Sequence, residues 1–269
     1  MGWAGYREDI VSRMADASRA GVSRQEPSRR SGEATSPTER APQGDEPKQS
    51  ALREFTAASA RPLPVIVLAD TSGSMSMGGK IEALNTALAD MVRAFAEEEE
   101  GRAAIHVAIV TFGGTAQVHQ ALAPASELNL RPLNATGMTP MGGAFDLARE
   151  LVEGLQSAPG RRPYTPALVL VSDGQPNDAW EEALSRLLES ERAKKAQRFA
   201  LGIGEDADAS VLRRFLANPE GKVYGAADAR QIKNFFRWVT MSVTVRSRSM
   251  NPNASAADDF PPSDLDELL

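Results

Sequence analysis

The sequence predicts an α/β fold, a doubly wound, mostly parallel sheet of the Rossmann-like kind with helices on both faces. Several apolar runs are nearly continuous rather than alternating, as expected for strands that are buried on both sides. These runs are separated by stretches with helical periodicity, which indicates strand–helix–strand units. One run, 116–122, mixes polar and apolar residues and therefore predicts a single antiparallel edge strand.

The first half of the chain supplies the centre of this sheet. Residues 63–69 read LPVIVLA, an apolar run that predicts a buried strand, and a helical pattern follows over 80–99. Residues 105–112, IHVAIVTF, predict the next strand, which leads into the edge strand 116–122. The glycine-rich stretch after it gives way to a helix at 142–156.

The second half of the predicted fold repeats the alternation three times. Each apolar run is short enough for a strand, and each is followed by a helical pattern. The strands are expected at 167–172, 198–203 and 222–226, and the helices at 179–195, 208–217 and 228–242.

The chain outside this core has a different composition. Residues 1–20 predict a short amphipathic helix, which either caps the domain or docks on a partner. Residues 21–55 are rich in proline and serine and predict a disordered linker, with Ser36 and Thr38 as candidate phosphorylation sites. The domain is expected over 60–246, followed by an acidic disordered tail over 247–269.

Composition excludes several classes of function. The 269 residues carry a net charge of −6 and no cysteine, so disulfides, thiolate zinc sites and cysteine nucleophiles are excluded. The acidic balance argues against a nucleic-acid partner. We find no apolar run of the roughly 18 residues that a membrane span needs and no secretory signal, so we expect no membrane partner and a cytoplasmic protein.

Polar side chains gather at the expected carboxyl ends of the strands. Asp70, Ser72 and Ser74 form the pattern D-x-S-x-S directly after the first strand. Thr139 lies in the glycine-rich loop GMTPMGGA, and Asp173 follows the strand 167–172. Ligands of open α/β sheets bind at this edge, so these residues are candidates for one site. Hydroxyl and carboxylate oxygens suit Mg²⁺, Mn²⁺ or Ca²⁺ rather than zinc.

Structural roles are the alternative for each of these residues. Asp70, Ser72 and Ser74 could be turn and capping residues, and Asp173 a turn former before a glycine. Thr139 could cap only the helix that follows it. Asp178 is predicted to cap the helix that starts at 179 rather than to bind metal.

Together these motifs resemble the metal-ion-dependent adhesion site (MIDAS) of von Willebrand factor A domains, over roughly 62–243. The resemblance implies a complete MIDAS in which Ser72 and Ser74 contact the metal directly and Thr139 contacts it directly or through water. It implies that Asp70 and Asp173 hold metal-bound waters. Neutral hydroxyls leave the cation most of its charge, so a partner's Asp or Glu completes its coordination. The strand with the sequence ALGIG is similar to the bacterial TerY-like group associated with tellurium resistance.

The resemblance implies an adaptor rather than an enzyme, which binds partner proteins through Mg²⁺ (or Mn²⁺/Ca²⁺). The TerY-like group implies a bacterial stress-response or defence module with a Ser/Thr kinase and a metal-dependent protein phosphatase. An alternative with the same fold is a substrate adaptor of an AAA-type ATPase. A Mg²⁺-dependent hydrolase is disfavoured because the chain has only two histidines, His106 and His119, and neither lies in a catalytic motif.

Residues 202–207 also fit the dinucleotide pattern G-x-G-x-x-A, through Gly202, Gly204 and Ala207. A true fingerprint follows the first strand of a βαβ unit, whereas this copy comes late in the chain. Two acids, Glu205 and Asp206, would also repel a pyrophosphate. We therefore interpret these glycines as a closely packed strand end.

The acidic tail supplies the last candidate contacts. Its candidate partner-binding residues are Asp264, Asp266, Glu267, Leu268 and Leu269. A carboxylate of this segment could cap the metal in cis or link copies in trans, because a flexible tether of about twenty residues spans about 25 Å. Alternatively, the leucines dock on another protein and never meet the metal.

Overall fold

The computed structural model describes residues 60–98, 101–155, 162–253 and 266–267, and these form an α/β domain around one sheet. Its seven strands lie in the order β3-β2-β1-β4-β5-β6-β7, parallel except for β3 and β7 at the two edges. The predicted fold class and the antiparallel edge strand 116–122 are confirmed. The strands are β1 (Arg61–Asp70), β2 (Ala103–Gly113), β3 (Thr115–Pro124), β4 (Ala167–Ser172), β5 (Gln197–Ile203), β6 (Tyr224–Ala226) and β7 (Asp266–Glu267).

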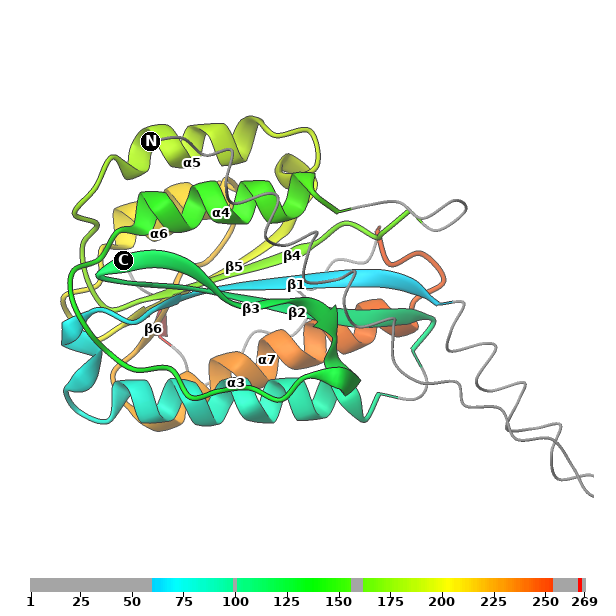
Figure 1. The fold of residues 1–269 in the computed structure, drawn as a ribbon, viewed down its shortest axis with the longest axis horizontal. Helices are drawn as coiled ribbons and strands as arrows, with labels where there is room; N and C mark the ends of the chain where they lie inside the picture. Colours follow the sequence, from blue (N-terminus) through cyan, green and yellow to red (C-terminus); the bar gives the residue numbers. More distant parts are fainter. Residues whose placement is uncertain (1–59, 99–100, 156–161, 254–265, 268–269) are drawn as a thin grey trace, which may run out of the picture. The chain divides into compact units, whose positions relative to one another are not determined.

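The helices form one layer on each face of the sheet. Figure 1 shows α3 and α7 on one face and α4, α5 and α6 on the other. The helices are α3 (Lys80–Ala96), α4 (Met141–Glu153), α5 (Trp180–Glu189), α6 (Ala209–Leu216) and α7 (Ala229–Arg248), with short 3₁₀ turns η2 (Gly73–Ser76), η3 (Ala125–Glu127) and η4 (Ala193–Lys195). Because both faces are covered, the last eight residues of β1 are all buried.

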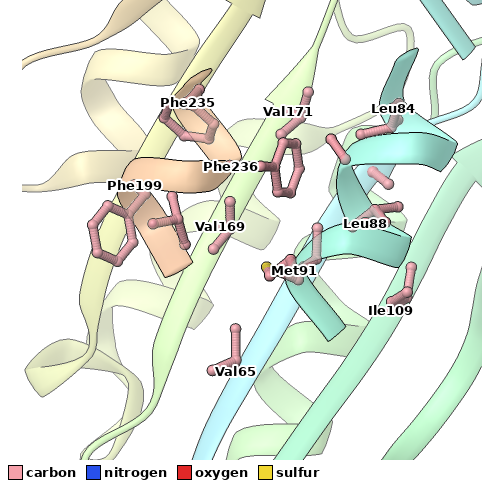
Figure 2. Close-up of a cluster of buried hydrophobic side chains, with 14 of the residues drawn as sticks. Val65, Leu84, Leu88, Met91, Ile109, Val169, Val171, Phe199, Phe235 and Phe236 are labelled. Atoms are coloured by element: carbon pink, nitrogen blue, oxygen red, sulfur yellow. The ribbon is translucent and has the colours of Figure 1, made fainter. Parts of the chain in front are cut away.

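Alternating residues of β1 enter two separate hydrophobic clusters. Val65 and Val67 belong to the cluster beneath α3 and α7, whereas Ile66 and Leu68 belong to the cluster beneath α4, α5 and α6. In Figure 2, side chains of the first cluster extend from both helices onto β1, β4 and β5. This two-sided packing holds the carboxyl end of β1 in place.

The strand order reverses direction at the centre of the sheet. β1 pairs with β2 on one side and with β4 on the other, so Val65 lies between Val107 and Ala167. The connections that leave the carboxyl ends of β1 and β4 therefore part to opposite sides. Such a switch point leaves a crevice in which ligands of open α/β sheets bind.

Two helix ends differ most from the sequence-based expectation. Helix α5 ends at Glu189 rather than near 195, because Ser190 leaves the helical conformation (ψ 130°) and a 3₁₀ turn follows. Helix α7 continues past 242 to Arg248. Arg246 explains this extension, since it is only 2% exposed and donates hydrogen bonds to the Pro252 and Thr165 carbonyls and the Gln197 side chain.

The expected disordered tail differs from the structure in two places. Residues 247–253 continue the ordered body, where the Asn253 side chain accepts a hydrogen bond from the Thr165 amide. Residues Asp266–Glu267 form β7 beside β6. The predicted helix 1–20 and linker 21–55, with Ser36 and Thr38, lie outside the described residues. No helix in the described part has the length and apolar character needed to cross a membrane.

Candidate metal centre

Two loops from distant parts of the sequence are tied together beside the carboxyl end of β1. The Gly73 amide donates to the Gly137 carbonyl (2.9 Å), and the Thr136 amide donates to the Thr71 carbonyl (2.7 Å). Gly137 has a φ of +71°, and a Cβ there would lie 2.5 Å from the Gly114 Cα. Only glycine fits at position 137, where the backbone passes close to Gly114. The two hydrogen bonds hold the Thr139 loop against the D-x-S-x-S loop.

Asp70 is fully buried at the end of β1. One carboxylate oxygen accepts from the Ser72 amide (2.8 Å), and the other accepts from the Ser172 hydroxyl (2.6 Å). Burial raises the pKa of Asp70 above its ordinary value, hydrogen bonds from Ser172 and Ser72 lower it, and the nearby Asp173 carboxylate raises it again. The carboxylate thus fixes the loop and adds negative charge to it.

Ser72, Ser74 and Asp173 form a continuous chain of oxygen atoms. The Ser72 and Ser74 hydroxyl oxygens lie 2.9 Å apart, and the Ser74 hydroxyl donates to Asp173 Oδ1 at 2.7 Å. Ser72 and Asp173 are buried, whereas Ser74 is partly open to solvent. The structure therefore brings the first strand's serines directly to the aspartate that follows β4.

Thr139 lies beside the loop that carries Asp173 and is buried, with 8% of its surface exposed. A Cβ on Gly174 would lie 4.0 Å from the Thr139 hydroxyl oxygen, so this hydroxyl faces the loop after β4. It has no hydrogen-bond partner among the described residues. Helix α4 begins at Met141 without a side-chain cap from Thr139, so the capping role considered for Thr139 does not apply.

Lys80, at the start of α3, is a member of this cluster that the sequence motifs did not single out. Its Nζ lies 2.6 Å from Asp173 Oδ2, and only 22% of the lysine side chain is exposed. Gly204 directly follows β5 with a φ of +78°, and a Cβ there would lie 3.5 Å from the Lys80 Nζ. The glycine of the ALGIG strand thus packs beside the lysine, in agreement with its interpretation as a close-packed strand end.

Asp178 has a different role from the predicted one. It does not cap α5, whose N-cap is Ala179. Instead its carboxylate accepts from the Gly142 amide (2.9 Å) and the Gly143 amide (3.0 Å) in the first turn of α4. A Cβ on Gly142 would lie 3.0 Å from a carboxylate oxygen of Asp178. Because Gly142 and Gly143 have no side chains, the Asp178 carboxylate can approach their amides at the start of the helix that follows the Thr139 loop.

The residues of this cluster fit a hard divalent cation. The cluster contains two carboxylates, Asp70 and Asp173, and one ammonium group, that of Lys80, which pairs with Asp173, so the acids outnumber the base. The donors include the partly exposed Ser74 hydroxyl and the unpartnered Thr139 hydroxyl, and such oxygens are ligands that Mg²⁺, Mn²⁺ and Ca²⁺ accept. Across the described residues, no group of three or more His, Cys, Asp or Glu side chains is placed to hold a metal.

Two of the tail residues proposed as metal caps, Asp266 and Glu267, have their backbone away from this cluster. Asp266 and Glu267 pair with Gly225 and Tyr224, whereas Asp264, Leu268 and Leu269 lie outside the described residues. Strands β5 and β6 separate β7 from β4, which places the β7 backbone about 14 Å from the β4 strand. The prediction that Asp266 or Glu267 caps the metal of its own chain is therefore wrong for this structure.

Comparison with known proteins agrees with this arrangement. The family model described as the von Willebrand factor type A domain matches residues 65–238, which extend from within β1 to the middle of α7 and include the whole cluster. The chain belongs to this family. A comparison with curated protein sequences finds no significant match.

Solved structures share the fold of this von Willebrand factor A domain at low identity. A von Willebrand factor type A protein from Catenulispora acidiphila is 21% identical, with a TM-score of 0.50, over 68% of this chain and 42% of that one. The pilus adhesin SpaC from Lactobacillus rhamnosus GG is 13% identical, with a TM-score of 0.56, over 70% and 31%. The D319A mutant of the PilB minor pilin from Streptococcus sanguinis is 14% identical, with a TM-score of 0.51, over 69% and 62%. The chain spans less than two thirds of each, so these likenesses concern the fold alone.

Proposed function

We propose that this von Willebrand factor A domain is an interaction module that binds partner proteins through a divalent cation. The observation that carries the proposal is the convergence of Asp70, Ser72, Ser74, Thr139 and Asp173 at the switch point of the sheet. Mg²⁺ is the proposed ion, with Mn²⁺ and Ca²⁺ as substitutes. When bound, the cation supplies an electrophilic centre that attracts an anionic ligand.

The residues of the chain have distinct tasks in this proposal. The Ser72, Ser74 and Thr139 hydroxyls face the cation, and Asp70 and Asp173 orient water on it. Because hydroxyls are neutral, the site favours an Asp or Glu side chain of the partner as a further ligand.

Two exposed methionines support a protein partner. Met77 follows the serine loop and is 61% exposed, and Met138 precedes Thr139 and is 62% exposed. Methionine side chains adapt to different surfaces and are common in promiscuous binding sites. They give an incoming partner apolar contacts on both loops, next to the carboxylate contact.

We place the domain among adaptors rather than enzymes. Both histidines of the chain lie away from the cluster, since His106 pairs with Pro64 in the first half of β1, and the His119 ring bonds to the Arg131 carbonyl. The proposed setting is a bacterial, cytoplasmic stress-response or defence module of the TerY-like kind, with a Ser/Thr kinase and a metal-dependent phosphatase. The alternative is that the domain delivers substrates to an AAA-type ATPase. A pull-down from the native host would distinguish the two by the partner that it recovers.

Calorimetric titration of Mn²⁺ into the full chain tests the metal site. We expect Ser74→Ala to weaken binding about 10- to 100-fold, the range seen when groups around a bound metal are lost. Ser76→Ala is the matched control, because the Ser76 hydroxyl lies in the same loop but donates to the Gly73 carbonyl. Equal affinity of wild type and Ser74→Ala would refute the proposed site.

A further inference from the structure

A short segment of the same chain pairs with the edge of β6 that faces away from β5. Strand β7 pairs antiparallel with β6, with Gly225 opposite Asp266 and Tyr224 opposite Glu267. Main-chain pairing at a free sheet edge is a common way to hold a peptide segment. The chain therefore already uses this edge as a docking surface.

The direction of β7 is set by its pairing with β6. Because the pairing passes from Gly225 to Tyr224 as β7 advances, the strand runs toward Val223 and Lys222. Two further residues in an extended conformation would reach about 7 Å beyond Glu267. This direction leads away from the carboxyl edge of the sheet, where the candidate metal centre lies.

A cavity of about 510 Å³ lies at that end of β6. Tyr224 and Lys222 line it, so it begins where the described part of β7 ends. Its apolar wall is formed by Phe199, Leu216 and Trp238. The rings of Phe199 and Trp238 pack edge to face, with their centroids 5.0 Å apart. The wall suits an aliphatic side chain.

The same cavity contains buried donors without acceptors. Arg198 Nε and Trp238 Nε1 are buried and have no hydrogen-bond partner among the described residues. Arg246 is also buried there and donates only to neutral oxygens. Burial lowers the pKa of Arg198 to about 10 and that of Arg246 to about 10. Buried donors and cations of this kind favour an acceptor or an anion.

The charges of the cavity and of the tail are complementary. The lining includes four basic residues, Lys195, Arg198, Lys222 and Arg246, and one acid, Glu220. The stretch of sequence that contains β7 reads DLDELL over 264–269, three acids and three leucines without a base. Asn253 also lines the cavity, so the chain leaves the cavity and returns to β6 after only twelve residues, 254–265. Such a short tether gives a high effective concentration.

We propose that the β6 edge and this cavity form a docking site for residues 266–269 of the same chain. Residues directly opposite in a strand pair share a face of the sheet, so in this docking an extended Leu269 would share the face of Tyr224 and meet the aromatic wall. Leu268 would share the face of Val223, on the side of Leu216. The unpaired Arg198 and Trp238 donors bind oxygens of the docked segment. This docking is independent of the proposed metal site.

The Trp238 indole signal in an NMR spectrum of the full chain tests the docking. We expect Leu268→Ser combined with Leu269→Ser to shift the Trp238 Nε1–H signal and to leave the Trp180 signal unchanged, because Trp180 lies outside the cavity. The change affects only the end segment, so the domain keeps its fold. Met250→Ser, at a residue that is 82% exposed and does not line the cavity, is the control. A Trp238 signal that does not respond to the double variant overturns the proposal.

A labelled peptide of residues 258–269 tests which chain supplies the segment. We expect fluorescence anisotropy to show binding to the Leu268→Ser/Leu269→Ser chain and at least tenfold weaker binding to wild type, whose site is occupied in cis. Arg198→Gln added to the double variant should weaken the peptide further. Equal binding to both chains overturns the proposal. A dimer found by sedimentation in wild type but not in the double variant also overturns docking in cis.

Discussion

Lys80 changes the electrostatics of the candidate metal centre at the scale of single residues. Asp70 and Asp173 are buried carboxylates that repel each other, and the Lys80 ammonium at 2.6 Å compensates Asp173. The lysine therefore stabilises the domain without metal. It also adds a positive charge that opposes a divalent cation bound beside the same carboxylate.

Lys80→Met should separate these two effects. Without the ammonium, the buried Asp173 loses a charged hydrogen bond, so the metal-free protein should lose about 1–3 kcal/mol of stability. Metal should then raise the melting temperature by more than it does in wild type. Thermal unfolding with and without Mn²⁺ measures both quantities.

Lys194→Met is the control for this variant, because Lys194 pairs with Glu191 on the surface. Its melting temperature and its response to Mn²⁺ should match those of wild type. A smaller metal response in Lys80→Met would contradict the opposing role of the lysine and make it a supporting residue of the metal centre.

At the scale of elements, the start of α4 supports the Thr139 loop. The Asp178 carboxylate accepts from the Gly142 and Gly143 amides, so a loop after β4 caps the helix that follows Thr139. The carboxylate also lies at the positive end of the helix dipole. One capping residue thus joins the two loops that carry Thr139 and Asp173.

Asp178→Ala should therefore affect both stability and metal binding. The lost cap should cost about 1–2 kcal/mol, and the loosened Thr139 loop should weaken Mn²⁺ binding several-fold. Asp208→Ala is a matched control, since Asp208 caps α6 through the Ser210 and Val211 amides, away from the cluster. Urea unfolding and calorimetry would test the pair, and equal metal affinity of the two variants would count against the link.

At the scale of the whole molecule, the two proposed binding sites lie at opposite ends of the sheet strands. The metal centre lies beyond the carboxyl ends of β1 and β4. The cavity proposed to bind residues 266–269 lies at the amino ends of β5 and β6. Gln197 and Tyr224 begin these strands, and both line the cavity. The sheet, covered by helices on both faces, lies between the two sites, so they share no residues.

The two sites should therefore act independently. Leu268→Ser with Leu269→Ser should leave the Mn²⁺ affinity within about twofold of wild type, because changes at distant sites without shared partners are additive. Ser74→Ala should leave the Trp238 indole signal unchanged. An increase in metal affinity in the double leucine variant would instead restore the idea that the tail caps the metal.

The sequence by itself determined the fold class, the positions of the buried strands along the chain and the five residues of the candidate centre. Runs such as VIVLA and the spacing of Asp70, Ser72 and Ser74 are local signals, and strand ends of a parallel sheet meet at one edge. The position of Asp173 followed from the same rule, although it is far from Asp70 in the chain. Thr139 followed from its glycine-rich loop before a helix and from the resemblance to the MIDAS.

Only the tertiary structure decided which distant groups touch. Lys80 reaches Asp173 across 93 positions, Ser172 reaches Asp70 across 102, and Asp178 caps α4 instead of its own helix. The extension of α7 depends on acceptors that other segments offer to Arg246, and β7 depends on a free edge at β6. Local periodicity carries no information about such partners, because strand order and helix packing set them.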